Sequence, residues 1–286
     1  MRFQVFKAGG KQGLGVVDAN GQLRGYLADE NAYPGALEAL IEQGDQVLQA
    51  AGRRLLEGHA FNTADVEVLP PLQRPGKIIC IGLNYLEHAK EGGFQAPDYP
   101  AVFARFHSSL IGSGAPLVRP KASEQFDFEG ELVVVIGKPG RHIAKEKALE
   151  HVAGYSVFND GSVRDYQMKG AQWTVGKNFD GTGAFGPCLV TPDEVPAGGK
   201  GLRVQTRLNG TIVQDGCTDE MIFDVATLIA LMSEALTLQA GDVIVTGTPP
   251  GVGFTRQPPL YMKAGDVCEV EIEGIGLLRN HVVDET

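Results

Sequence analysis

The sequence predicts a strand-rich α+β protein, with a small N-terminal α/β domain over residues 1–70 and a larger domain over residues 71–286. Three observations predict this class. Short apolar runs dominate the chain after residue 70. These runs do not alternate regularly with helical patterns, as they would in a doubly wound sheet. A stretch containing Pro70, Pro71 and Pro75 separates the two parts.

The first 70 residues combine strand and helix patterns. Residues 3–7 and 14–18 are typical of strands around a Gly-rich turn, and Asn20-Gly21 is a strong signal for a two-residue hairpin turn. Apolar residues recur at helical spacing across residues 35–56, which predicts one amphipathic helix that Gly44 can interrupt.

The larger part contains more strand patterns than helix patterns. Strands are expected at residues 77–82, 132–137, 202–208, 242–247 and 267–272, and helices at residues 84–91, 144–152 and 219–238. Gly92 and Gly93 suit the end of the first of these helices. Asp219 and Glu220 suit the start of the last one, because acidic side chains are favourable at a helix N-terminus.

Composition excludes several classes of protein. Asp plus Glu total 35 against 25 Lys plus Arg, and this net charge of -10 argues against a nucleic-acid partner but not against a small anionic substrate. The four cysteines are scattered, which argues against a zinc cluster or a disulfide framework. No apolar run approaches the roughly 20 residues of a membrane span, so no membrane partner is expected. Residues 1–4 lack the apolar stretch of a signal peptide, so the expected location is the cytoplasm.

Carboxylates cluster around two strand patterns. Glu129 and Glu131 precede the apolar run 132–136, and they share one face if the extended chain begins at Glu129. Two carboxylates so close need a cation or a shared proton, although a solvated acidic edge also fits the pattern. Asp160 follows the apolar residues 155–158, at the expected end of another strand, where it could equally be a helix cap.

Further polar residues follow Asp160. Ser162 suits a helix cap, and Arg164 and Gln167 would then share one helical face at i, i+3 spacing. A guanidinium, an amide and a carboxylate together suit an anionic substrate held beside a metal. A surface ion pair is the alternative for this segment.

Three other side chains are candidates for binding or catalysis. His88 and Glu91 are neighbours on the expected helix 84–91, as a carboxylate-oriented general base requires, or as a surface ion pair. Lys177 lies in a Gly-containing loop near the only Trp, and it is either a cleft residue or an ordinary exposed Lys. Thr248 lies in the loop 245–253, which can surround an anion with backbone N–H groups or form a tight structural turn.

Seven ordered motifs between about residues 77 and 282 resemble the fumarylacetoacetate hydrolase family, in particular its three-carboxylate, metal-dependent members with an extra small N-terminal domain. The motifs are G-L-N-Y-x-x-H-A, S-S-L-I-G, D-F-E-G-E-L-x-V-V-I-G, G-Y-x-V-x-N-D, R-D-x-Q, W-x-x-G-K-x-F-D and T-G-T-P-x-G-V-G. The resemblance implies a mixed β-roll catalytic domain and a homodimer. The further Asp ligand of the larger fumarylacetoacetases has no counterpart here.

The resemblance also implies roles for the candidate residues. The metal ligands would be Glu129, Glu131 and Asp160; the catalytic residues His88, Glu91 and Lys177; and the substrate contacts Arg164, Gln167 and Thr248. Three oxygen ligands favour Mg²⁺ or Mn²⁺, and Ca²⁺ can also bind such a set. Arg105, Phe106 and His107, with the loop 92–100, are candidates for the distal side of the pocket.

The expected substrate is a small anionic 2-oxo acid. The leading interpretation is a hydrolase that cleaves a carbon–carbon bond in a 2,4-dioxo acid such as an acylpyruvate or fumarylpyruvate, in aromatic or sugar-acid breakdown. His88 and Glu91 would activate water, and the metal would stabilise the pyruvate enolate. A lyase or isomerase on the same metal site is the alternative, such as an oxaloacetate decarboxylase, a ureidoglycolate lyase or a hydroxymuconate isomerase. An inactive binding protein is a third interpretation.

Overall fold

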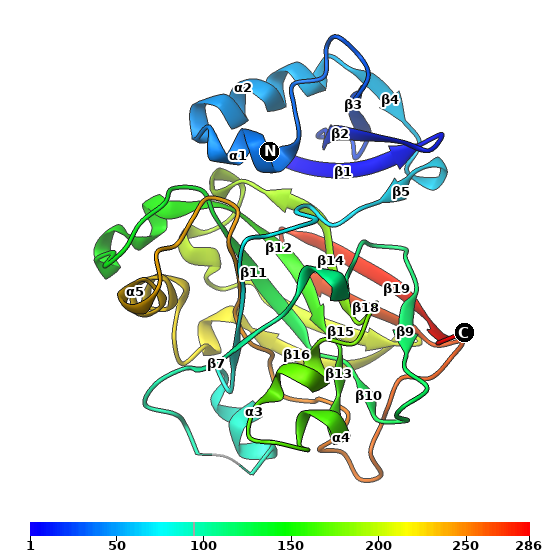
Figure 1. Cartoon of the computed structure of the whole chain (residues 1–286), viewed down its shortest axis with the longest axis vertical. Helices are drawn as coiled ribbons and strands as arrows, with labels where there is room; N and C mark the ends of the chain where they lie inside the picture. Colours follow the sequence, from blue (N-terminus) through cyan, green and yellow to red (C-terminus); the bar gives the residue numbers. More distant parts are fainter. Residues whose placement is uncertain (94) are drawn as a thin grey trace.

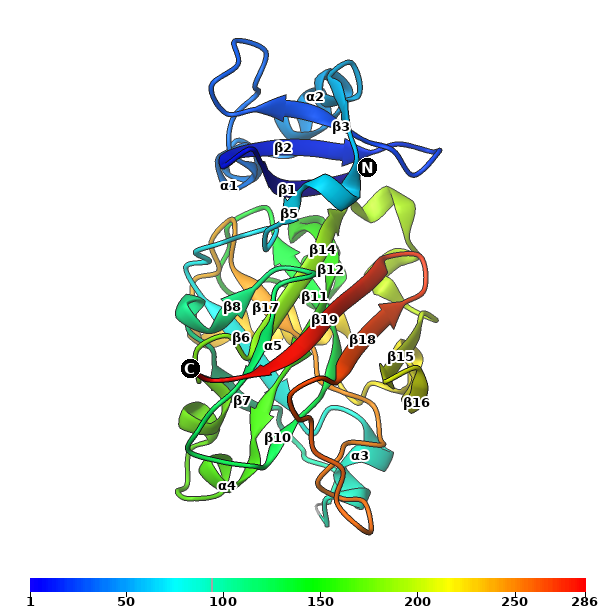
Figure 2. The same ribbon diagram turned by 90° about the vertical axis from the view of Figure 1, so that its right-hand side faces the viewer.

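The computed structural model describes residues 1–93 and 95–286, and it confirms the strand-rich α+β class (Figure 1). A twelve-stranded mixed sheet runs through the molecule, and a five-stranded sheet packs against part of it (Figure 2). The apolar core between them includes Leu132, Val157 and Val270. Within the described residues no helix is long and apolar enough to cross a membrane.

The N-terminal part combines a curved set of strands with two short helices. Its strands are β1 (Arg2–Ala8), β2 (Lys11–Val17), β3 (Leu23–Leu27), β4 (His59–Phe61) and β5 (Glu67–Val68), and its helices are α1 (Leu37–Glu42) and α2 (Asp45–Leu56). The expected interruption at Gly44 is confirmed, because its φ of 93° breaks the helix in a region that favours glycine.

The main sheet does not stop at the N-terminal part. Strand β1 pairs with β14 (Gly183–Val190), with Arg2 opposite Val190 and Phe3 opposite Leu189. The division into domains at residue 70 therefore stays a prediction, since one sheet crosses it.

The centre of the main sheet positions the acidic residues. Its other strands are β6 (Ile78–Gly82), β7 (Ala101–Ala104), β8 (Leu110–Ile111), β11 (Gly130–Ile136), β12 (Val152–Asp160) and β17 (Val243–Val245). Strand β11 is buried along its whole length, as its run of Val and Ile predicts. It pairs antiparallel with β12, Gly130 lying opposite Asn159. The start of β11 therefore lies beside the end of β12.

The second sheet has the order β16-β15-β18-β19-β9. Its strands are β9 (Leu117–Arg119), β15 (Arg203–Leu208), β16 (Thr211–Cys217), β18 (Val267–Ile272) and β19 (Gly276–Asp284), and a separate small ladder joins β10 (Phe126–Asp127) to β13 (Ser162–Val163). Most inward-facing residues of β18 and β19 are apolar and buried, which lets this sheet cover β11, β12 and β14.

Among the described residues, the larger part of the chain also contains three short α-helices. They are α3 (Leu86–Glu91), α4 (Arg164–Gln167) and α5 (Val225–Ala235), with a 3₁₀ segment at Lys145–His151 where an α-helix was expected. Figure 1 places α3 and α4 at the end of the molecule opposite the N-terminal part.

The helix expected over residues 219–238 begins later, at Val225. The N–H groups of Ile222 and Phe223 are bonded to Asn84, at 2.7 Å to its carbonyl oxygen and 2.8 Å to its Oδ1, so they cannot join the helix. Asp224 caps the helix instead, accepting from the Thr227 N–H at 2.9 Å.

Candidate active site

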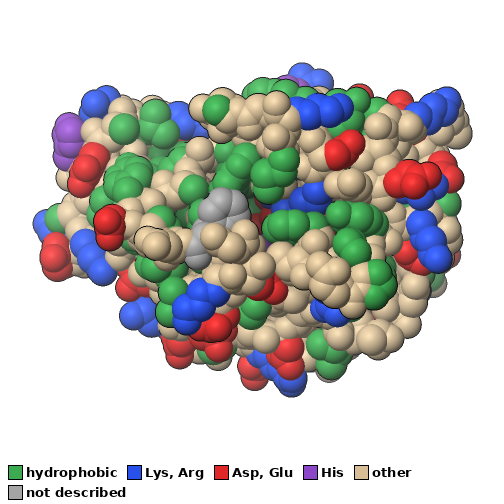
Figure 3. Space-filling model, turned by 90° about the horizontal axis from the view of Figure 1, so that it is seen from below, with side chains coloured by type: hydrophobic (Ala, Val, Ile, Leu, Met, Phe, Trp, Pro, Cys, Tyr) green, Lys and Arg blue, Asp and Glu red, His purple; other side chains and the backbone are tan. Residues whose placement is uncertain are grey.

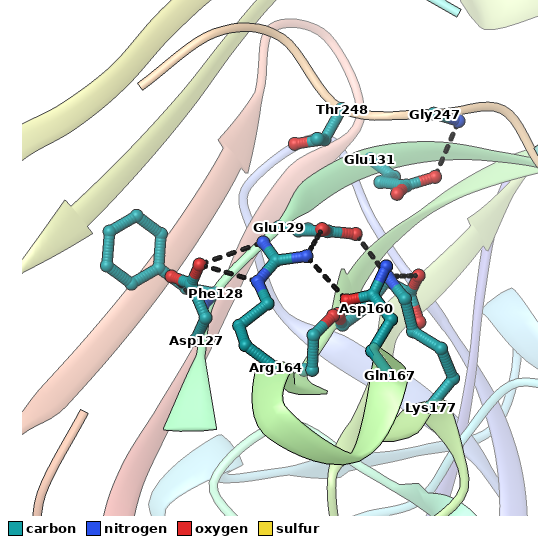
Figure 4. A network of polar contacts seen from close by, with 12 residues as sticks. Asp127, Phe128, Glu129, Glu131, Asp160, Arg164, Gln167, Lys177, Gly247 and Thr248 are labelled. Atoms are coloured by element: carbon teal, nitrogen blue, oxygen red, sulfur yellow. Dashed lines mark hydrogen bonds and ion pairs between the residues drawn. The ribbon is translucent and has the colours of Figure 1, made fainter. Parts of the chain in front are cut away.

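Three carboxylates meet where β11 begins and β12 ends (Figure 4). One oxygen from each of Glu129, Glu131 and Asp160 lies within 4.8 Å of the others, and all three side chains are buried. Strand alternation turns Glu129 and Glu131 to one face, and the β11–β12 pairing brings Asp160 beside them. These carboxylates therefore do not form a solvated acidic edge. The role of the three residues as metal ligands stays a prediction.

Buried cations surround two of these carboxylates. The Lys177 Nζ lies 2.6 Å from a Glu129 oxygen and 2.7 Å from an Asp160 oxygen. Arg164 Nη1 lies 2.6 Å from the other Glu129 oxygen, and Arg105 donates to Asp160. Burial alone would raise the pKa of Glu129, but the charges of Lys177 and Arg164 outweigh it and lower that pKa to about 2.

Glu131 differs from the other two carboxylates. It accepts a hydrogen bond from the Gly247 N–H at 2.5 Å and forms no ion pair with any described residue. Burial, followed by the charges of Asp160 and Glu129, raises the pKa of Glu131. A buried carboxylate without a cation is costly, and a hard divalent cation bound by all three acids would remove that cost. The donor set therefore fits a divalent-metal site built from oxygen ligands.

His88 and Glu91 form a pair on α3, beside a cavity that Glu129 and Glu131 also line. The His88 Nδ1 lies 2.8 Å from a Glu91 oxygen, and the other Glu91 oxygen accepts from the Gly251 N–H at 2.9 Å. His88 is only 8% exposed and lines the cavity with Glu129 and Glu131. With Nδ1 bonded to the carboxylate, Nε2 is the nitrogen left for substrate. This pair is not on the surface, and its catalytic role stays a prediction.

The three residues expected to contact substrate also line this cavity, together with Trp173 and Phe254. Arg164 Nη1 donates to Gln167 Oε1 at 2.9 Å, as their shared helical face predicts. The Thr248 hydroxyl donates to the Gly130 carbonyl at 3.0 Å and accepts from Gln214 at 2.8 Å. Thr248 thus has internal partners as well as a place on the cavity wall.

Ser162 does not cap α4. Its hydroxyl donates to the Asp160 carbonyl at 2.7 Å, and the helix begins directly after Val163 without a side-chain cap.

The prediction that Arg105, Phe106 and His107 line the distal side of the pocket is wrong. Arg105 is buried, and it donates to Asp160 and, at 2.8 Å, to Thr182. Phe106 and His107 are exposed and do not line the cavity. In the loop 92–100, Gly92 lines the cavity, and position 94 lies outside the described residues. The sequence gives no sign of the Arg105–Asp160 pair, because its members are 55 residues apart.

Figure 3 shows the face at this end of the molecule, where hydrophobic side chains surround a hollow. A cleft lined by buried carboxylates and cations, with a His–Glu pair beside them, is typical of an enzyme active site.

Comparison with known proteins identifies the class. The family described as "Fumarylacetoacetate (FAA) hydrolase C-terminal" matches residues 77–283, so the chain belongs to the fumarylacetoacetate hydrolase family and is an enzyme of that family.

Among its relatives, the chain is 42% identical to the human protein named oxaloacetate tautomerase FAHD2A, mitochondrial, over 99% of this chain and 92% of the human one. A solved fumarylacetoacetate hydrolase from Exiguobacterium antarcticum is 37% identical, with a TM-score of 0.85 and full coverage of both chains. Maleylpyruvate hydrolase from Sphingobium sp. SYK-6, solved with manganese(II) and pyruvate, is 28% identical, with a TM-score of 0.81 and full coverage of both chains.

These relatives correct the expected cytoplasmic location. The frog, human and rat oxaloacetate tautomerases, 41–42% identical to this chain, are mitochondrial. The expectation was wrong because the lack of an apolar N-terminal stretch bears on secretion, whereas mitochondrial transit peptides are amphipathic and Arg-rich.

Proposed function

We propose that this enzyme is a divalent-metal-dependent oxaloacetate tautomerase, which moves a proton between C3 and the C2 oxygen of a 2-oxo dicarboxylate. The observation that carries the proposal is that His88, bonded to Glu91, lines one cavity with two of the three clustered carboxylates, Glu129 and Glu131. The 42% identity to a protein of that name supports this reaction among those the site can perform.

The metal would be Mg²⁺ or Mn²⁺, held by Glu129, Glu131 and Asp160. Three carboxylate oxygens suit either ion, and a similar solved hydrolase contains manganese. When bound, the cation would polarise the 2-oxo group and make the neighbouring C–H more acidic.

The chain's own residues would move the proton. His88 Nε2 takes a proton from C3, and Glu91 stabilises the imidazolium that forms. The C3–H electron pair moves into the C2–C3 double bond, and the carbonyl pair moves to oxygen. The Lys177 ammonium stabilises that developing negative oxygen. His88 then returns the proton, to oxygen for the enol or to carbon for the keto form.

Hydrolysis of an acylpyruvate is the second candidate, because the same pair can activate water. In that reaction His88 takes a proton from water, and the hydroxide attacks the distal carbonyl. The carbon–carbon bond breaks, the acyl part leaves as a carboxylic acid, and the pyruvate carbon keeps the electron pair and takes the proton back from His88. The likeness to maleylpyruvate hydrolase supports it. The aromatic or sugar-acid breakdown expected from the sequence stays a prediction attached to this candidate.

The test is an assay of three reactions with one preparation of metal-loaded enzyme. Enol oxaloacetate is followed by its ultraviolet absorbance, decarboxylation by pyruvate release, and acylpyruvate hydrolysis by loss of the diketone absorbance. We expect fast loss of the enol without matching pyruvate release. Acylpyruvate cleavage with no acceleration of enol loss would instead establish the hydrolase.

A variant of the base tests the mechanism. His88→Ala should lower kcat by at least about a hundredfold, the usual contribution of a general base, while Mg²⁺ affinity measured by calorimetry stays unchanged. The exposed His107→Ala serves as the matched control, since His107 does not line the cavity. Loss of metal from the His88 variant would contradict the assigned role.

A further inference from the structure

A fourth buried carboxylate, Asp127, lies behind the site. It ends β10, two residues before Glu129, and is 0% exposed. Its Oδ1 accepts from the N–H groups of Phe128 and Gly253, both at 2.8 Å. Its Oδ2 accepts from the Phe254 N–H at 3.0 Å and from Arg164. The proposed reaction makes no direct use of this group.

Asp127 fixes the orientation of the Arg164 guanidinium beside the cavity. Its Oδ2 lies 2.8 Å from both Nε and Nη2 of Arg164, so it holds that edge of the planar group (Figure 4). The Phe254 ring lies against the guanidinium face, 4.3 Å from its central carbon. Nη1 points toward the site, where it meets Glu129 and Gln167. Nη2 is buried and has no hydrogen-bond partner among the described residues, although it lies 2.8 Å from Asp127 Oδ2.

The same carboxylate fixes the loop that supports the catalytic pair. At Gly253 a Cβ atom would lie 2.5 Å from Asp127 Oδ1 and 1.8 Å from the Leu260 carbonyl oxygen, so only glycine permits this approach. Two residues earlier, the Gly251 N–H holds Glu91. Asp127 therefore fixes both Arg164 and the loop carrying Phe254.

We propose that Asp127 is a positioning residue that makes the site selective for dicarboxylates, by holding the Arg164 guanidinium in the orientation that binds the second carboxylate of the substrate. This inference rests on the proposed function. A guanidinium recognises a carboxylate through a fixed planar geometry, so an Arg164 free to rotate would keep its charge but lose this selectivity. The charge of this second carboxylate stays the same while the neighbouring C3 loses its proton, so the contact stabilises the bound substrate and the transition state alike. Its loss therefore raises KM more than it lowers kcat.

The experiment measures KM and kcat for oxaloacetate, and competitive inhibition by pyruvate, which lacks the second carboxylate. Asp127→Asn keeps an Oδ1 acceptor for the Gly253 N–H, and so the loop beside Glu91, but it loses the charge that holds Arg164. It should raise KM for oxaloacetate at least about tenfold and change kcat and pyruvate inhibition less than about threefold. Asp165→Asn is the matched control, since Asp165 bonds Ser123 rather than Arg164. Equal weakening of oxaloacetate and pyruvate would overturn the inference.

A double-variant cycle separates positioning from general damage. If Asp127 acts through Arg164, Asp127→Asn should change KM little once Arg164→Ala is present, whereas a purely structural effect would add fully. Full additivity would overturn the inference.

Arg164→Lys tests the same idea without altering Asp127, in case Asp127→Asn does not fold. Lysine keeps the charge but cannot be held along a planar edge, so this variant should also lose selectivity for oxaloacetate over pyruvate. Wild-type selectivity in Arg164→Lys would overturn the inference. Failure of the proposed function is distinguishable, because the wild-type enzyme itself would then not accelerate oxaloacetate tautomerisation.

Discussion

At the scale of single residues, the three acids of the site have unequal surroundings. Glu129 and Asp160 are each paired with buried cations, whereas Glu131 has a backbone N–H as its partner. A divalent ion would therefore compete with Lys177 for Glu129 and Asp160. It would not compete with a cation for Glu131. This inequality makes Glu131 the most informative of the three to change.

Glu131→Gln should weaken Mg²⁺ or Mn²⁺ binding by at least about tenfold, as lost ligand charge does. It should also leave the metal-free protein as stable or raise its Tm, because a buried carboxylate without a cation is removed. Calorimetric titration and thermal unfolding in a chelator measure the two effects. Glu87→Gln, at an exposed residue paired with Lys90, is the control. Unchanged metal affinity would remove Glu131 from the ligand set.

At the scale of elements, helix α3 is held to the sheet by the side chain of Asn84. Its Nδ2 donates to the carbonyls of Thr246, at 2.7 Å, and Phe223, at 3.0 Å, and its Oδ1 accepts from the Phe223 N–H at 2.8 Å. These bonds join the start of α3 to the loop after β17 and to the segment before α5. The position of His88 thus depends on a residue that does not itself line the cavity.

Asn84→Ala should destabilise the protein by about 3 kcal/mol, because it leaves buried backbone groups unpaired. It should also lower kcat, because His88 is no longer held in place for proton transfer. Urea unfolding and steady-state kinetics measure these effects, and Asn20→Ala, in an exposed turn, is the control. A variant that loses stability but keeps full kcat would show that α3 is positioned by other contacts.

The helices and strands show how much of the fold could be predicted from the sequence. Apolar runs identify β6, β11 and β18 to within a few residues, because fully or half-buried strands carry their own pattern. The predicted start of α5 was wrong because Asn84, 138 positions before Ile222, accepts hydrogen bonds from the N–H groups of Ile222 and Phe223. The ordered motifs located the acidic cluster and the His–Glu pair, but the partners that orient them, Asp127 and Arg105, required the folded chain.

At the scale of the whole molecule, exposed apolar residues gather beside the edge strand β7. Val102 on β7 is 44% exposed, and Phe106 and Val175 nearby are 54% and 62% exposed. Scattered exposed apolar residues are ordinary, but a group on a sheet edge is typical of a contact surface. The homodimer expected from the family resemblance stays a prediction, and this is the surface that we expect it to use.

Light scattering after size-exclusion chromatography should therefore give twice the 30.5 kDa chain mass. Val102→Glu should shift the protein toward monomer, because it places a charge in the apolar contact. Ile212→Glu is the control, since Ile212 is 51% exposed on β16, at an edge of the other sheet. A wild-type monomer at micromolar concentration would contradict the dimer.

The pairing of β1 with β14 has a consequence for how the chain can be divided. Strand β14 bonds to β12, which ends in Asp160, along one side, and residues 189–190 bond to β1 along the other. Strand β1 therefore pairs with the sheet that carries the three clustered carboxylates. A chain that lacked residues 1–70 would leave the backbone N–H and C=O groups of residues 189–190 unpaired on this side. Such an exposed strand edge can pair with strands of other molecules. We therefore expect strand β1 to protect this part of the main sheet from aggregation.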